Sequence, residues 1–153
     1  MLTVLKISAL FLTMLTAAPG LAHLFELPNK IGLPRDAYFT VQGIYAGWAL
    51  FGVVIMAAIA ANLFLAWRLQ RYNRGSSKFA VCSAALIAVS LGIFFTWTLP
   101  ANQATLNWTT IPEDWERLRT AWEYSHAVKA LINTAAFLAT AVAITSETPP
   151  PSR

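Results

Sequence analysis

Residues 37–67 read AYFTVQGIYAGWALFGVVIMAAIAANLFLAW and contain no Asp, Glu, Lys or Arg. Residues 79–112 share this property, and in residues 7–25 only His23 could carry a charge. A fourth run, residues 127–145, is interrupted only by Lys129 and Asn133. Each run reaches or exceeds the roughly 18–20 residues that cross a hydrocarbon core as a helix. The sequence therefore predicts an all-α fold, a bundle of four transmembrane helices.

The composition supports the same class of protein. Charged residues make up 12% of the chain, against about 25% in an average soluble domain. The net charge is +4, but the basic residues do not cluster on one soluble face, so we expect a lipid bilayer and no nucleic acid as partner. Cys82 is the single cysteine, so the chain cannot form an intramolecular disulfide.

We expect helices over about residues 3–25, 43–67, 79–99 and 112–145. Together they make one membrane domain over residues 1–146, followed by a disordered, proline-rich tail at 147–153. The connector between the first two helices contains Pro28, Gly32 and Pro34 and is predicted to be a turn-rich loop. The last helix would be about 50 Å long. Its elongated, amphipathic N-terminal half should therefore project beyond the bilayer or lie at its surface.

The distribution of basic residues predicts the orientation. The loop between the second and third helices contains Arg68, Arg71, Arg74 and Lys78 and no acidic residue, which predicts a cytoplasmic loop. Both termini are then cytoplasmic as well, and we expect a bacterial inner membrane. Residues 1–22 also resemble a secretory signal. Cleavage would remove a packing partner from the bundle, so we favour a retained first helix.

A polar and aromatic stripe leads into the fourth apolar run. Its members are spaced by 4, 3, 4, 3 and 4 positions and therefore share one face of a helix. They are Trp115, Arg119, Trp122, His126, Lys129 and Asn133. Ionisable residues inside membrane spans are costly and suggest a functional site.

Each residue of the stripe also has a structural interpretation. The tryptophans, with Trp108 of the preceding linker, could be interface anchors, and Arg119 could form an ion pair with Glu116 or Glu123. The Lys129 side chain could extend to the membrane surface. Asn102, in the same linker, could cap a helix rather than orient a ligand.

The predicted topology brings the two histidines to the same level of the outer half. Each has a carboxylate one helical turn away, in His23-x-x-Glu26 and in Glu123-x-x-His126. Carboxylate and imidazole ligands at this spacing build metal sites inside helix bundles. Two His and two Glu would suit a single iron, manganese or zinc ion. Ordinary loop charge and ion pairs explain the same pattern, so the cofactor, if any, stays open.

Several motifs resemble the anthrone-oxygenase-like family of small four-helix membrane proteins. The most specific is residues 115–126, WERLRTAWEYSH, preceded by Pro100-x-Asn102 and by residues 107–109, NWT. Residues 23–30, HLFELPNK, and Gln42-x-x-Tyr45-x-x-Trp48 extend the resemblance toward the N-terminus. The resemblance implies a functional set of Asn102, Trp115, Arg119, Trp122 and His126. Fungal members of the family oxidise polyketide anthrones to anthraquinones with dioxygen.

Two functions therefore stand as hypotheses. In the first, an outward-facing pocket between the helix ends holds a flat apolar or phenolic substrate. His126 or Glu123 acts as the general base, and Arg119 stabilises the anion. Asn102, Trp108, Trp115, Trp122 and Lys129 would then bind the substrate. In the second, the protein is not catalytic, and the same region binds a lipid, a quinone or a protein partner.

Overall fold

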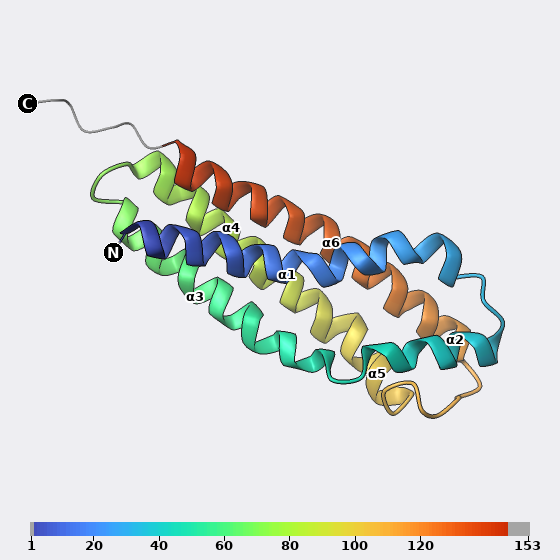
Figure 1. The fold of residues 1–153 in the computed structure, drawn as a ribbon. Helices are drawn as coiled ribbons and strands as arrows, with labels where there is room; N and C mark the ends of the chain where they lie inside the picture. Colours follow the sequence, from blue (N-terminus) through green and yellow to red (C-terminus); the bar gives the residue numbers. More distant parts are fainter. Residues whose placement is uncertain (1, 147–153) are drawn as a thin grey trace, which may run out of the picture.

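The computed structural model describes residues 2–146, and in that range the chain is helical without a β-strand. Four long helices lie side by side as a bundle (Figure 1). They are α1 (Leu2–Lys30), α3 (Phe51–Leu69), α4 (Arg74–Ile93) and α6 (Trp115–Thr145). The predicted all-α bundle is confirmed. The tail expected at residues 147–153 lies outside the described residues.

Four segments of the bundle are long and apolar enough to cross a membrane. They are Leu2–Lys30, Trp48–Leu69, Arg74–Ala104 and Trp115–Thr145. Large hydrophobic side chains point outward along them, as Val53 and Leu131 do with 72% and 62% of their surface exposed. Outward-facing apolar surface on every span is what a lipid environment requires. The chain is therefore an integral membrane helical protein.

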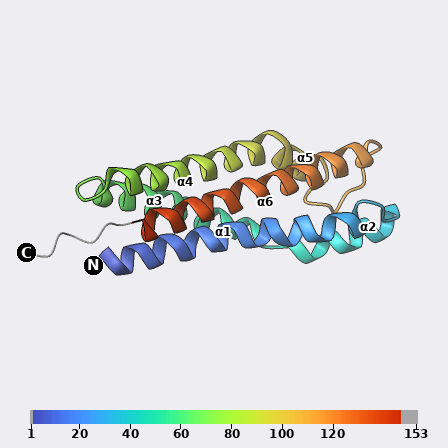
Figure 2. The same cartoon turned by 90° about the horizontal axis from the view of Figure 1, so that it is seen from above.

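The two ends of the bundle differ in structure. One end holds the start of α1, the α3–α4 turn and the last turn of α6 (Figure 1). The opposite end carries two short helices, α2 (Arg35–Gln42) and α5 (Leu99–Ala104), seen again after rotation in Figure 2. We call this second end the capped end. Both histidines lie toward it, because α1 runs into it and α6 starts from it.

The connector predicted as a loop is largely helical. α1 passes through Pro28 and ends at Lys30, beyond the predicted end at residue 25. After a short turn α2 begins at Arg35, and the Tyr38 backbone N–H donates to the Pro34 carbonyl at 2.9 Å. The added turn of α1 brings Lys30 to the buried Glu123 carboxylate, with 3.1 Å between Nζ and Oε1. This ion pair stabilises the part of α1 beyond residue 25. A prediction from the positions of proline and glycine cannot detect it.

Three other boundaries also shift. Two 3₁₀ turns, η1 (Gly43–Tyr45) and η2 (Trp48–Leu50), precede α3, which therefore begins later than residue 43. α4 passes through the π-helical turn η3 (Phe94–Thr98) into α5 rather than ending at residue 99. A proline ring clashes with the carbonyl of the preceding helical turn, and the wider π turn gives Pro100 room. α6 begins at Trp115 rather than at 112, after a turn in which the Trp115 N–H donates to the Pro112 carbonyl.

Close packing of α1 against α6 depends on one glycine. A Cβ atom built on Gly20 would lie 3.0 Å from the Ala130 Cα and 3.3 Å from its Cβ. Small residues at such crossings let membrane helices approach closely. His23 and His126 lie one turn further along the same two helices, so this contact also fixes the distance between them.

Replacing Gly20 with Ala should lower the thermal midpoint of the detergent-solubilised protein, because the new methyl group meets Ala130 backbone and forces the helices apart. Overpacking of this kind costs about 1–3 kcal/mol. Gly92→Ala is the matched control, since nothing lies within 4 Å of a Cβ at that helical position. Circular-dichroism melting curves measure both variants. Equal midpoints for Gly20→Ala and the wild type would contradict the close crossing.

Candidate functional site

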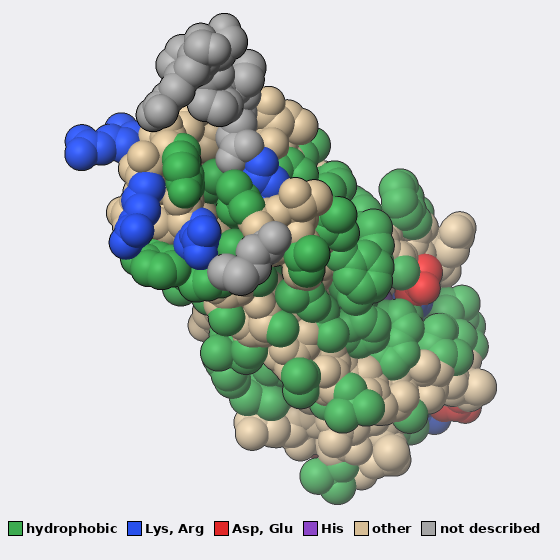
Figure 3. All heavy atoms as spheres, turned by 60° about the vertical axis from the view of Figure 1, so that its left-hand side comes forward, with side chains coloured by type: hydrophobic (Ala, Val, Ile, Leu, Met, Phe, Trp, Pro, Cys, Tyr) green, Lys and Arg blue, Asp and Glu red, His purple; other side chains and the backbone are tan. Residues whose placement is uncertain are grey.

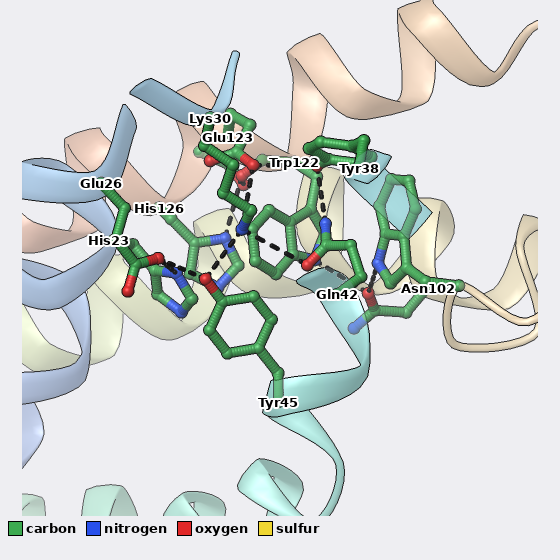
Figure 4. A network of polar contacts seen from close by, with 12 residues as sticks. His23, Glu26, Lys30, Tyr38, Gln42, Tyr45, Asn102, Trp122, Glu123 and His126 are labelled. Atoms are coloured by element: carbon green, nitrogen blue, oxygen red, sulfur yellow. Dashed lines mark hydrogen bonds and ion pairs between the residues drawn. The ribbon is translucent and has the colours of Figure 1, made fainter. Parts of the chain in front are cut away.

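The two histidines meet inside the capped end. The imidazole rings of His23 and His126 have centroids 4.2 Å apart, and only 4% of the His23 surface is exposed. The Trp122 ring lies against both, with centroids 5.0 Å from His23 and 4.0 Å from His126 (Figure 4). Tyr45 and Trp48 close the other side of His23, at 4.6 and 5.5 Å. The predicted juxtaposition of the histidines is thus present within an aromatic enclosure.

The backbone determines which nitrogen of His126 is free. Its Nδ1 lies 2.9 Å from the Trp122 carbonyl oxygen, one turn earlier on α6. A carbonyl can only accept a hydrogen bond, so Nδ1 carries the proton. The lone pair of the neutral ring is then on Nε2, the arrangement that a general base needs. On the partner ring, Nδ1 of His23 is buried without a hydrogen-bond partner.

A buried ion pair lies beside the histidines. Glu123 and Lys30 are 1% and 3% exposed, and their charged atoms are 3.1 Å apart. The Tyr38 hydroxyl donates to the same Oε1 atom at 2.9 Å and accepts from Gln42 Nε2 at 2.6 Å. The second oxygen of the carboxylate, Oε2, is buried and has no hydrogen-bond partner. Glu123 is therefore held in place on one side and unpartnered on the other.

A second branch of the network leads toward the surface. Lys30 Nζ donates to the Tyr45 hydroxyl at 2.8 Å, and that hydroxyl donates to Glu26 Oε2. The Glu26 side chain is 37% exposed, and its Oε2 atom lies 3.8 Å from His23 Nδ1. Glu26 therefore connects the buried cluster, the histidine pair and the exterior (Figure 4).

Both tyrosines of the network stay protonated over the physiological range. Burial raises the pKa of the Tyr38 hydroxyl above its ordinary value, and the adjacent Glu123 carboxylate raises it further. Burial and the hydrogen bond to Glu26 likewise raise the pKa of Tyr45. A neutral phenol between charged groups can pass a proton without becoming an anion, because it accepts on one side and donates on the other.

Asn102 has a positioning role. Its Oδ1 atom accepts from the indole N–H groups of Trp108 and Trp122, at 3.0 and 2.9 Å. Trp108 follows Leu106 and Asn107 in a stretch with positive φ angles of 46°, 56° and 66°. Such angles are costly for residues with a side chain and tend to cluster at functional sites. This unfavourable backbone conformation places the Trp108 indole beside Tyr38, with ring centroids 5.3 Å apart.

Arg119 joins the stripe to the α1–α2 connector. Its Nη1 donates to the Leu33 carbonyl at 3.0 Å, and its guanidinium lies 4.6 Å from the Trp115 ring centroid and 5.5 Å from that of Tyr38. The alternative ion pairs with Glu116 or Glu123 are not among the contacts of the described residues. Arg119 Nε remains buried without a partner.

Lys129 points to the π-helical turn. It is 9% exposed, and its Nζ donates to Thr98 Oγ1 at 3.1 Å and lies 5.1 Å from the Phe94 ring centroid. Thr98 in turn shares a 2.8 Å hydrogen bond with Ser125. These contacts direct the ammonium toward η3, on the side of α6 that faces α4 and η3.

A largely apolar groove of about 680 Å³ opens on that side of α6. It is lined by residues of α4, η3 and α6, namely Ile93, Trp97, Arg117, Thr120, Ala121, Tyr124, Ser125 and Val128. These α6 positions lie on the helix face opposite His126. The groove is therefore distinct from the pocket predicted between the helix ends.

The predicted site residues fall into adjoining groups, which Trp122, Lys30 and Tyr38 connect. Trp122 touches both histidines, whereas Glu123 pairs with Lys30, and Arg119 and Trp115 stack beside Tyr38. Within residues 2–146, no group of three or more His, Cys, Asp or Glu side chains is arranged to hold a metal ion. The metal set of His23, Glu26, Glu123 and His126 stays a prediction.

Four partners that complete the network were not predicted as site residues. Lys30, Gln42 and Tyr45 appeared only in the motifs of the resemblance, and Tyr38 was missed. Their spacing carried a signal. His23, Glu26 and Lys30 are spaced by 3 and 4 positions, and Tyr38 and Gln42 are four apart, as one face of a helix requires. This spacing indicates a shared face only if the connector between the first two spans is helical, and the connector was predicted to be a loop.

Comparison of the chain with protein-family models, with curated proteins and with solved structures found no match.

Proposed function

We propose that the capped end is an acid–base site that oxidises a flat apolar or phenolic substrate with dioxygen, as the resemblance to anthrone oxygenases implies. The observation that carries the proposal is the His126 Nδ1 contact with the Trp122 carbonyl, which leaves Nε2 as a base beside a second buried imidazole. The aromatic enclosure of Trp122, Tyr45 and Trp48 offers ring faces for a flat substrate. We further propose that this end faces outward from a bacterial inner membrane, with both termini cytoplasmic.

The chemistry balances without further reactants. Nε2 of His126 removes a proton from the activated CH₂ group, and the resulting carbanion supplies electrons to dioxygen. One oxygen atom becomes the new carbonyl and the other leaves as water, so that R₂CH₂ + O₂ gives R₂C=O + H₂O. We favour His126 over Glu123 as the base because Lys30 and Tyr38 engage the carboxylate. Arg119 Nε, which is unpartnered, would stabilise the anion.

Oxygen uptake with an anthrone tests the proposal, with autoxidation measured in protein-free detergent. His126→Ala should lower the catalysed rate by about 10²–10⁴-fold, the usual contribution of a general base. Free imidazole should restore part of it, which a purely structural role would not allow. Thr145→Ala is the control, because that exposed hydroxyl bonds only to its own helix. Equal rates for wild type and His126→Ala would refute the role of His126.

The groove favours a second candidate function, binding of a lipid or quinone without catalysis. Its lining is mostly apolar, and it opens between helices that face the bilayer. A photoreactive quinone should label groove residues such as Trp97 and Tyr124, and Val128→Trp should abolish that labelling by filling the groove. Labelling that persists in Val128→Trp would contradict this candidate.

A further inference from the structure

Charge is divided unequally between the two ends of the bundle. Six acidic residues fall in the described part of the chain, and all of them lie toward the capped end. The opposite end carries the basic turn between α3 and α4, and Figure 3 shows Lys and Arg side chains gathered there. This end therefore presents concentrated positive charge.

The basic turn encloses a shallow cavity of about 410 Å³. It is lined by Gln70, Arg71, Arg74, Ser77 and Lys78. The turn itself is well defined: Asn73 Oδ1 accepts from the N–H groups of Gly75 and Ser76 and caps α4. Ser77 Oγ donates to the Ala66 carbonyl at 2.9 Å, which ties the start of α4 to α3. These hydrogen bonds fix the backbone that carries Arg71, Arg74 and Lys78.

The arrangement of these cations is unfavourable without an anion. Arg74 and Lys78 are exposed and lie four residues apart on one helix face, where like charges repel each other. Both also lie in the first turns of α4, where the helix dipole disfavours positive charge. No carboxylate of residues 2–146 forms an ion pair with Arg71, Arg74 or Lys78. An external anion in the cavity would relieve both repulsions.

The position of the cavity indicates the source of that anion. Trp67, at the end of α3, is 47% exposed and stacks on Phe64, itself 46% exposed, with ring centroids 5.3 Å apart. The Arg71 guanidinium lies 5.5 Å from the Trp67 ring. Exposed tryptophan beside the end of an apolar span is typical of the membrane interface. The cavity is therefore at the level of lipid headgroups, with an aromatic surface for acyl chains directly beneath it.

We infer that the α3–α4 turn is a binding site for an anionic phospholipid, with the phosphate held by Arg71, Arg74 and Lys78 and the acyl chains against Trp67 and Phe64. Basic pockets between transmembrane helices bind lipid headgroups in this way. Positive charge that only set the topology would show no preference for a particular headgroup in detergent. The two explanations can therefore be separated.

Native mass spectrometry of the full chain in detergent tests the site. The protein is titrated with phosphatidylglycerol, with phosphatidylcholine of the same acyl chains, and with inorganic phosphate. One phosphatidylglycerol should bind in preference to phosphatidylcholine, and excess phosphate should not displace it. Arg71→Gln/Arg74→Gln should weaken binding about 25-fold, since each cation near a lipid surface contributes about fivefold. Lys78→Gln alone should weaken it about fivefold.

Arg35→Gln is the matched control for Lys78→Gln, because it removes one exposed cation from the capped end. It should bind phosphatidylglycerol as the wild type does. Far-UV circular dichroism checks that all variants fold. Equal binding of the two lipids, unchanged binding in Arg71→Gln/Arg74→Gln, or an equal loss in the control would each overturn the site. Displacement by phosphate would assign the cavity to a free anion instead of a lipid.

Discussion

Replacing Lys30 with Met should lower the free energy of unfolding by about 3–5 kcal/mol, the cost of leaving a buried charge without its partner. The Glu123 side chain is fully buried, and only Tyr38 would then hydrogen-bond to it. The loss can be measured in detergent by titration with sodium dodecyl sulfate, followed by circular dichroism. This is the largest single-residue effect that we expect at the capped end.

A second substitution isolates the cause. In Lys30→Met/Glu123→Gln both charges are absent, and the new amide can still accept from Tyr38, so most of the stability should return. Arg35→Met should change stability by less than about 1 kcal/mol, because its ion pair with Asp36 is exposed. If the double variant is as unstable as Lys30→Met, then lost packing, rather than an unpaired carboxylate, explains the effect.

The bundle could be predicted because a membrane span depends mainly on the length of an uncharged, apolar run of sequence. A long run without charge has few alternatives to a transmembrane helix, so the four charge-poor runs specified both the class of protein and the number of spans. The boundaries depend instead on tertiary contacts. α1 extends to Lys30 because a carboxylate from α6 meets it there, and α4 passes Pro100 because η3 widens. Neither the contact with Glu123 nor the wider turn at η3 can be predicted from the local sequence.

For the candidate site too, the placement of the histidines could be predicted from the sequence, but their surroundings could not. Topology alone brought His23 and His126 to one level, because each lies near the same end of an antiparallel pair of helices. Their environment could not be predicted, since it comes from Tyr38 and Gln42 on a helix that the proline and glycine pattern concealed. Asn102 shows a further limit. Its type suggested a cap or a ligand contact, and its actual partners are two indoles.

A polar cluster in the middle of the bundle links the four long helices. Asn62 of α3 is fully buried, and its Nδ2 donates to Thr13 of α1 and to the Ala58 carbonyl, both at 2.9 Å. Its Oδ1 accepts from Thr140 of α6 at 2.9 Å, and Thr140 in turn lies 2.8 Å from Ser83 Oγ of α4. In lipid, such hydrogen bonds between helices replace part of the stabilisation that burial of apolar surface gives in water.

Asn62→Leu should therefore cost about 3 kcal/mol of unfolding free energy. It removes three hydrogen bonds of about 0.6–1.7 kcal/mol each and leaves the hydroxyls of Thr13 and Thr140 with fewer partners. Thr96→Ala is the control, since that exposed hydroxyl bonds only to the Gly92 carbonyl of its own helix. Denaturant titration in detergent compares the two variants. A cost for Asn62→Leu no larger than that of Thr96→Ala would mean that apolar packing alone sets the register of the four helices. A large cost, together with unchanged phosphatidylglycerol binding, would show that the cluster stabilises the bundle without shaping the lipid site at its basic end.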